Sequence, residues 1–107
     1  MKDANTTRNQ DIPGLYETDS MHLAKKIIHQ KWDLKRVQFY WLIAELSKKE
    51  NLAFGYANLN DDVFAEWGYI SISELIDNGA ERDLTWQPCS FEEAQKRIKQ
   101  HKKQQIT

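Results

Sequence analysis

Charged side chains between residues 66 and 83 are the best candidates for chemistry in this chain of 107 residues. Glu66, Glu74 and Asp83 offer carboxylates for proton transfer or for a divalent ion, and Arg82 offers a guanidinium fork that holds an anion. A structural role is the alternative: Glu74 can close a helix capping box, and Arg82 can pair with an acid such as Glu66. Surface carboxylates usually do no chemistry, so the structural interpretation is favoured.

The histidines and the single cysteine offer little for a metal site or a nucleophile. His22, His29 and His101 match no zinc spacing such as HExxH. Cys89 has no disulfide partner within the chain. If it acts as a nucleophile, His22 or His29 would be its base. The helix start that follows Cys89 would then lower the pKa of its thiol. We expect Cys89 to be structural, and we expect neither a metal nor another cofactor.

Two aromatic residues, Trp67 and Tyr69, form a candidate binding hot spot around Gly68. The chain is 11% aromatic, and a sheet this small is not expected to hide every ring. Gly68 allows another backbone to approach, and two amphipathic rings at one place favour a contact surface. Packing in the core is the alternative for both rings.

Charge is unevenly distributed along the chain, although the net charge is only −1. Residues 21–50 hold seven Lys/Arg against three Asp/Glu. Residues 51–93 hold one Arg against nine acids, and residues 94–107 hold five Lys/Arg and no acids. With aromatic residues between the charges, the basic segment 25–36 and the C-terminal lysines raise nucleic-acid binding as a second hypothesis. The pI near 6.3 is low for that function, and oppositely charged segments can simply attract each other within the fold.

The hydrophobic pattern predicts a scaffold of four or five antiparallel strands. The run 37–46 is the most apolar in the chain, and both alternating sets are apolar, which is typical of a central strand covered on both faces; a buried helix is the alternative. Short polar breaks between the runs predict a meander. Gly55, inside a later strand, predicts a bulge or a close backbone approach. The predicted strands cover residues 26–32, 37–46, 52–57, 67–70 and 82–86.

Two capping boxes predict helices that pack on this sheet. Ser71 and Ser90 are each followed three residues later by a glutamate, which predicts helices at about 72–78 and about 91–103. The second helix carries an apolar stripe and late lysines, the polarity that a helix dipole favours. The fold class is therefore α+β, with an antiparallel meander sheet and both helices packed on it. Residues 1–13 are predicted as a disordered leader, 14–103 as a single domain and 104–107 as a disordered tail.

Three strings in order carry a family resemblance: Leu15-Tyr16-Glu17-Thr18-Asp19, the run from Glu66 to Leu75, and Glu81-Arg82-Asp83-Leu84. Over residues 15–93 the chain resembles the family known as domain of unknown function 2958, small proteins found largely on bacterial and archaeal plasmids and other mobile elements. It departs from the family at 58–62 and 76–80, where members carry a longer acidic, glycine-containing segment and a proline-rich stretch. The resemblance implies the fold and a mobile-element setting, and no activity comes with it.

We therefore expect an accessory domain, non-catalytic, that binds a protein partner through Trp67, Tyr69, Arg82 and the adjacent acids. Nucleic-acid binding is the second hypothesis, and a small enzyme that uses the carboxylates of Glu66, Glu74 and Asp83 is the third. The single cysteine, the polar N-terminus and the lack of a run of about 18 apolar residues predict a cytoplasmic location without a membrane partner.

Overall fold

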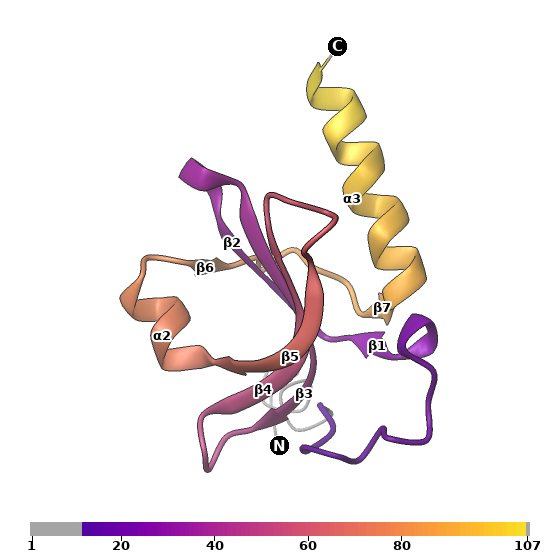
Figure 1. Ribbon diagram of the computed structural model, residues 1–107, viewed down its shortest axis with the longest axis vertical. Coiled ribbons are helices and arrows are strands. Elements are labelled where there is room, and N and C mark those ends of the chain that lie inside the picture. Colours follow the sequence, from indigo (N-terminus) through magenta and orange to yellow (C-terminus); the bar gives the residue numbers. More distant parts are fainter. Residues whose placement is uncertain (1–11, 107) are drawn as a thin grey trace, which may run out of the picture.

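A twisted five-stranded sheet forms the centre of the protein, as the computed structural model of residues 12–106 shows (Figure 1). Residues 1–11, which include most of the predicted leader, and Thr107 lie outside the described residues. The strands are antiparallel and ordered β5-β4-β3-β2-β6, which confirms the predicted α+β class and the meander. They are β2 (Gln30–Leu34), β3 (Phe39–Ser47), β4 (Leu52–Leu59), β5 (Glu66–Ser71) and β6 (Glu81–Arg82).

β3 is the central strand, as predicted for 37–46, and it is covered on both faces. Successive side chains of a strand point to opposite faces, so Leu42 and Ile43 enter different cores. Ile43 belongs to a cluster with Leu75 of the short helix α2 (Ile72–Asp77). Leu42 belongs to a cluster with Ala94 of the long helix α3 (Phe91–Ile106). Each face of the sheet therefore carries one helix.

The segment predicted as one strand over 26–32 is divided between two sheets. β1 (Ile27–Ile28) pairs with β7 (Cys89–Ser90), whereas β2 begins at Gln30 and pairs with β3. At the junction, the backbone N–H of His29 still donates to Ile43 O of β3 at 2.8 Å. The prediction of a single strand is wrong because the partner of β1 lies far along the chain, and no local pattern signals it.

Gly55 in β4 occupies the close approach that its position in a strand predicted. A Cβ atom at this position would lie 2.0 Å from the carbonyl oxygen of Leu42 on β3. The register between β3 and β4 shifts between Ile43 and Glu45, which marks a bulge in β3 directly beside the glycine. Only a residue without a side chain fits there.

Both predicted capping boxes begin helices. Ser71 Oγ accepts a hydrogen bond from the backbone N–H of Glu74 at 3.2 Å, and Ser90 Oγ accepts one from Glu93 at 3.3 Å. α3 runs past the predicted end at 103 and includes part of the predicted tail. Within the described part of the chain, neither helix is long and apolar enough to cross a membrane.

The last predicted strand, 82–86, is wrong beyond its first residue. The chain turns instead at Asp83, whose carboxylate accepts hydrogen bonds from the backbone N–H and the hydroxyl of Thr85 at 2.9 and 2.6 Å. Trp86 then leaves the sheet, and its indole Nε1 donates to Ile28 O at 3.0 Å. The residue types favour a strand locally, but the side chain of Asp83 closes a turn that competes with it.

Candidate interaction surfaces

The predicted site residues lie at opposite edges of the sheet. Glu66, Trp67 and Tyr69 are on β5, whereas Arg82 is on β6 and Asp83 follows it. Neighbouring strands are about 4.8 Å apart, so four strand steps separate these two groups by about 19 Å. The predicted pairing of Glu66 with Arg82 is therefore wrong, because strand order separates the two residues.

Glu74 does not join either group. It lies in the first turn of α2, exposed, and its backbone N–H bonds to the capping Ser71. The carboxylates of Glu66 and Asp83, proposed for an enzyme together with Glu74, are held at the two far edges of the sheet. The three carboxylates thus belong to separate parts of the fold.

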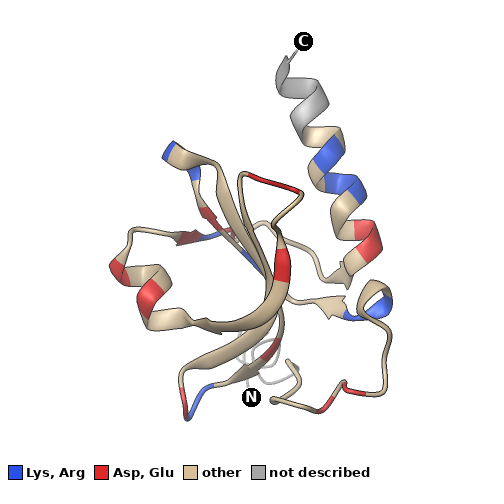
Figure 2. Ribbon diagram, in the orientation of Figure 1, with Lys and Arg blue, Asp and Glu red and all other residues tan. Residues whose placement is uncertain are grey.

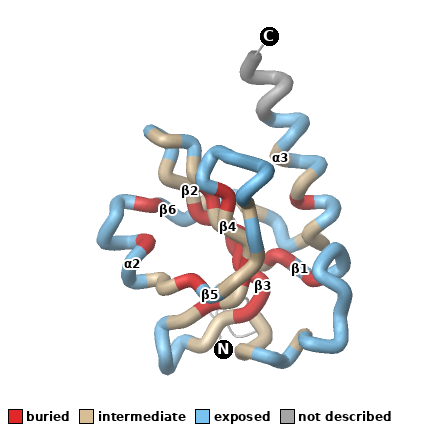
Figure 3. Tube along the Cα trace, in the orientation of Figure 1, coloured by how far each residue is buried: buried red, intermediate tan, exposed pale blue. Residues whose placement is uncertain are grey.

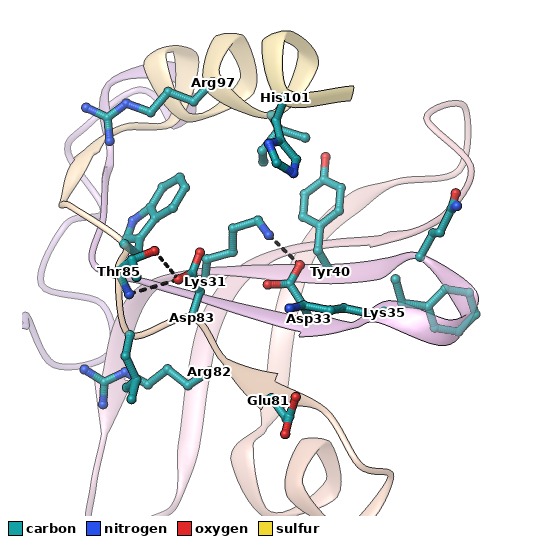
Figure 4. A pocket seen from close by; sticks show the side chains of 15 residues that line it. Lys31, Asp33, Lys35, Tyr40, Glu81, Arg82, Asp83, Thr85, Arg97 and His101 are labelled. Carbon is teal, nitrogen blue, oxygen red and sulfur yellow. Dashed lines mark hydrogen bonds and ion pairs between the residues drawn. The ribbon is translucent and has the colours of Figure 1, made fainter. Parts of the chain in front are cut away.

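Arg82 and Asp83 line an open groove of about 1150 Å³ beneath α3 (Figure 4). β2 and the start of β3 form its floor, residues 81–86 form one wall, and α3 forms the other. Figure 4 shows Arg97 and His101 on α3 above Lys31 and Tyr40, which project from the floor. The groove therefore brings together residues from three parts of the sequence.

The floor of the groove is polar, with its charges paired. Lys31 Nζ and the carboxylate of Asp33 form an ion pair, and both side chains are largely buried. Lys31 Nζ also lies 5.7 Å from the centroid of the Tyr40 ring, within cation–π range. Burial alone raises the pKa of Asp83, but hydrogen bonds from Thr85 and the positive charge of Lys31 together lower this pKa below its ordinary value. The neighbours of Asp83 thus favour the charged form of its carboxylate, and Lys31 is paired with Asp33.

Two residues that sequence reasoning did not assign to a site, Trp86 and Arg97, build the end of the groove nearest β1. Arg97 Cζ lies 5.8 Å from the centroid of the Trp86 ring, and Arg97 Nη1 donates to Gln87 O at 3.0 Å. Leu84 stands at the rim with 82% of its surface exposed. The Glu-Arg-Asp-Leu string predicted a site in this wall. It did not predict that α3 would lie opposite the wall.

The rings of Trp67 and Tyr69 share a row of aromatic side chains on the α3 face of the sheet. The Trp67 ring lies 4.9 Å from that of Phe91, the first residue of α3, and 5.6 Å from that of Phe54. Tyr69 contacts Phe54 at 5.5 Å and Tyr16 at 6.3 Å, and 55% of its surface is exposed. Trp67 thus anchors α3, and Tyr69 is the more exposed member of the predicted hot spot.

The basic segment 25–36 does not form one basic face (Figure 2). Lys26 is buried beside Glu45, and Lys25 Nζ lies 2.7 Å from Glu92 Oε1 at the start of α3. Lys35 and Arg36 are exposed on the short 3-10 turn η2 (Lys35–Val37). Of these pairs, only Lys25–Glu92 joins the basic segment to the acidic part of the chain, whereas Lys26 and Glu45 both lie within residues 21–50.

Cys89 has a different environment from the one that its sequence position predicted. The residue is half-buried in β7 and packs with the α3 core. Burial raises the pKa of its thiol, which the positive charge of Arg97 only partly offsets. The expectation of a lowered pKa is wrong, because desolvation and the negative charge of Glu93 outweigh the positive charge of Arg97.

Comparison with known proteins assigns no family: no protein-family model matches the chain, and no curated protein or solved structure matches it significantly. The resemblance carried by the three sequence strings stays a prediction. The surfaces described above are therefore interpreted from their own chemistry.

Proposed function

We propose that this chain is a non-catalytic binding domain that holds a segment of a protein partner in the groove between α3 and the 81–86 wall. The observation that carries this proposal is the mixed lining of the groove: charges of both signs, aromatic rings and an exposed leucine. Small-molecule pockets enclose their ligands in roughly 300–1,000 Å³. A larger, open groove suits a stretch of polypeptide.

Charge favours a protein over a nucleic acid in this groove. Lys31, Lys35, Arg82 and Arg97 line it, but so do Asp33, Glu81 and Asp83, so four cations face three carboxylates. A phosphate backbone would meet those three acids at close range, whereas a polypeptide with side chains of both signs would pair with both sets. Nucleic-acid binding is the alternative, supported by the half-buried ring of Trp86 in the groove.

The absence of catalysis is part of the same proposal. The hydrogen bonds from Thr85 stabilise the charged form of Asp83, and Lys31 and Asp33 are held in an ion pair. A general acid or base works best with a pKa near neutral pH, and a carboxylate with a lowered pKa is a poor proton donor. These interactions support positioning of a partner instead of proton transfer.

The setting of the domain also belongs to the proposal. The three family-like strings support an origin on a mobile element, where a small accessory domain acts on proteins of its host or of the element. A single cysteine supports a reducing, cytoplasmic location. The partner is then a cytoplasmic protein with an accessible segment that carries both charges and at least one apolar side chain.

Crosslinking from the groove tests the proposal directly. A photoreactive amino acid is placed at Leu84, on the groove rim, and in a second version of the full chain at Leu23, exposed but outside the groove. Irradiation in host cells should give an adduct from position 84 that protease removes and nuclease leaves intact. Arg82→Ala in the same chain should weaken that adduct.

The outcomes separate the alternatives. An adduct at Leu84 that nuclease removes would favour the nucleic-acid hypothesis. Equal yields of adduct from Leu84 and Leu23 would show that crosslinking is not specific to the groove. Adducts that contain a second copy of this chain are identified by mass and are not counted as the partner.

A further inference from the structure

We propose that two copies of this chain pair antiparallel through β5, around a two-fold axis that passes between their Gly68 residues. This surface is separate from the groove, because β5 and β6 are the two edges of the sheet. β5 has six residues, and among the residues that the structure describes no strand pairs with its outer side. An open edge of this length is a template for a further strand.

The register of β5 shows which backbone groups face outward. Phe54 pairs with Tyr69 and Gly55 with Gly68, and one position beyond the strand the N–H of Ile72 donates to Asn51 O at 3.4 Å. In an antiparallel ladder, hydrogen-bonded and non-hydrogen-bonded pairs alternate. Counting back from Ile72, residues 66, 68 and 70 bond to β4, and the backbone groups of 67 and 69 point to the open edge.

Gly68 has no explanation within its own fold. A Cβ atom there would meet no atom within 4 Å, and Gly68 is not among the glycines with positive φ. Its neighbour across the strand pair, Gly55, has the opposite surroundings, because a Cβ there meets the Leu42 carbonyl. Glycine weakens a strand and commonly marks close approach of another chain. The open space lies over the face of the sheet that carries α2, because side chains of a strand alternate between faces and position 68 shares the face of Ile70.

A two-fold axis at Gly68 sets the register of the pairing, so that each residue of β5 lies opposite a compatible residue of the partner subunit. Trp67 then lies opposite Tyr69 of the partner subunit, and both have outward-facing backbone groups that can exchange hydrogen bonds. The two rings add an aromatic cross-strand pair. Glu66, the one charged residue of β5, lies opposite Ile70 of the partner subunit, so no like charges meet.

Exposed apolar side chains beside β5 supply the rest of the interface. Val63 and Phe64, in the loop before β5, are 84% and 79% exposed, and Ile76 on α2, after β5, is 58% exposed (Figure 3). Antiparallel pairing brings the loop of one copy towards α2 of the other. Stable interfaces bury about 800 Å² on each partner, more than short strands supply alone, so these contacts are needed.

Charge substitutions at Gly68 test the axis itself. Sedimentation velocity of the full-length protein from micromolar to millimolar concentration should show a dimer. Gly68→Glu and Gly68→Lys should each be monomeric where the wild type is dimeric, because like charges meet at the axis. An equimolar mixture of the two variants should regain the dimer, since Glu then faces Lys. The distant charge change Lys49→Glu should leave the dimer intact.

Three results would overturn the proposal. The first is a wild type that stays monomeric at every concentration. The second is a dimer that both charged variants retain, because another surface would then join the copies. The third is an equimolar mixture of the two charged variants that stays monomeric, because opposite charges at the axis should restore the dimer.

Discussion

Lys26 and Glu45 form a buried ion pair, with Nζ and Oε2 3.8 Å apart and side chains that are only 4% and 3% exposed. Lys26 Nζ also donates to the carbonyl and hydroxyl oxygens of Thr18 at 2.5 and 2.6 Å. Glu45 accepts hydrogen bonds from the backbone N–H groups of Tyr16 at 2.8 Å and Thr18 at 3.1 Å. The pair thus ties the segment before the first strand to the sheet, directly after the bulge in β3.

Removing one partner of this pair should destabilise the fold strongly. Glu45→Gln leaves the ammonium of Lys26 buried without a counter-charge, and the expected loss in the free energy of unfolding is about 3–5 kcal/mol. Urea denaturation at neutral pH measures it. The exposed control Glu50→Gln should change stability by less than about 0.5 kcal/mol. If the two variants lose the same amount, the pair is not an important contact.

Acid should weaken the same contact. Burial alone raises the pKa of Glu45, but hydrogen bonds from Thr18 and Tyr16 and the charge of Lys26 lower it below the ordinary 4.5. The unfolded chain therefore takes up the proton first as pH falls. The stabilisation is complete above the ordinary pKa and is lost as pH falls through the folded-state pKa, so stability should drop as pH is lowered through and below about 4.5. The free energy of unfolding, measured by denaturation at a series of pH values through this range, should fall less steeply with decreasing pH for Glu45→Gln than for the wild type. Equal slopes would contradict the assignment.

The paired glycines Gly55 and Gly68 should respond oppositely to alanine. Gly55→Ala forces a Cβ into the Leu42 carbonyl and should cost about 1–3 kcal/mol, as overpacking usually does. Gly68→Ala meets open space and should be neutral or stabilise by up to about 1 kcal/mol, because alanine restricts the unfolded chain. Thermal unfolding of both variants at the same dilute concentration makes the comparison. Similar losses at both positions would mean that the Leu42 contact is not decisive.

Cys89 should react slowly with alkylating agents. Its raised pKa leaves little thiolate at neutral pH, and only the thiolate is nucleophilic. Iodoacetamide labelling of the folded protein should be several-fold slower than that of the urea-unfolded chain, and the rate should keep rising above the ordinary thiol pKa. Fast labelling at neutral pH would instead support the hypothesis that Cys89 acts as a nucleophile.

Local patterns predicted the individual elements well. The run 37–46 is apolar on both alternating sets because β3 lies between two cores, and each capping serine bonds to an amide three residues away. These signals depend only on neighbours in sequence. The predictions that failed, one strand over 26–32 and a strand over 82–86, needed a partner strand or a turn that the local pattern did not show.

By itself, the sequence determined an α+β domain, its central strand, the helix starts and the glycine that the β3 bulge requires. Only the tertiary structure decided which side chains meet. Strand order placed Glu66 and Arg82 at opposite edges, and the packing of Ala94 against Leu42 held α3 above the sheet, so that Arg97 meets Trp86 at one end of the groove. The physical reason is that periodicity and capping act within a few residues, whereas strand pairing and helix docking depend on burial between segments far apart in the chain.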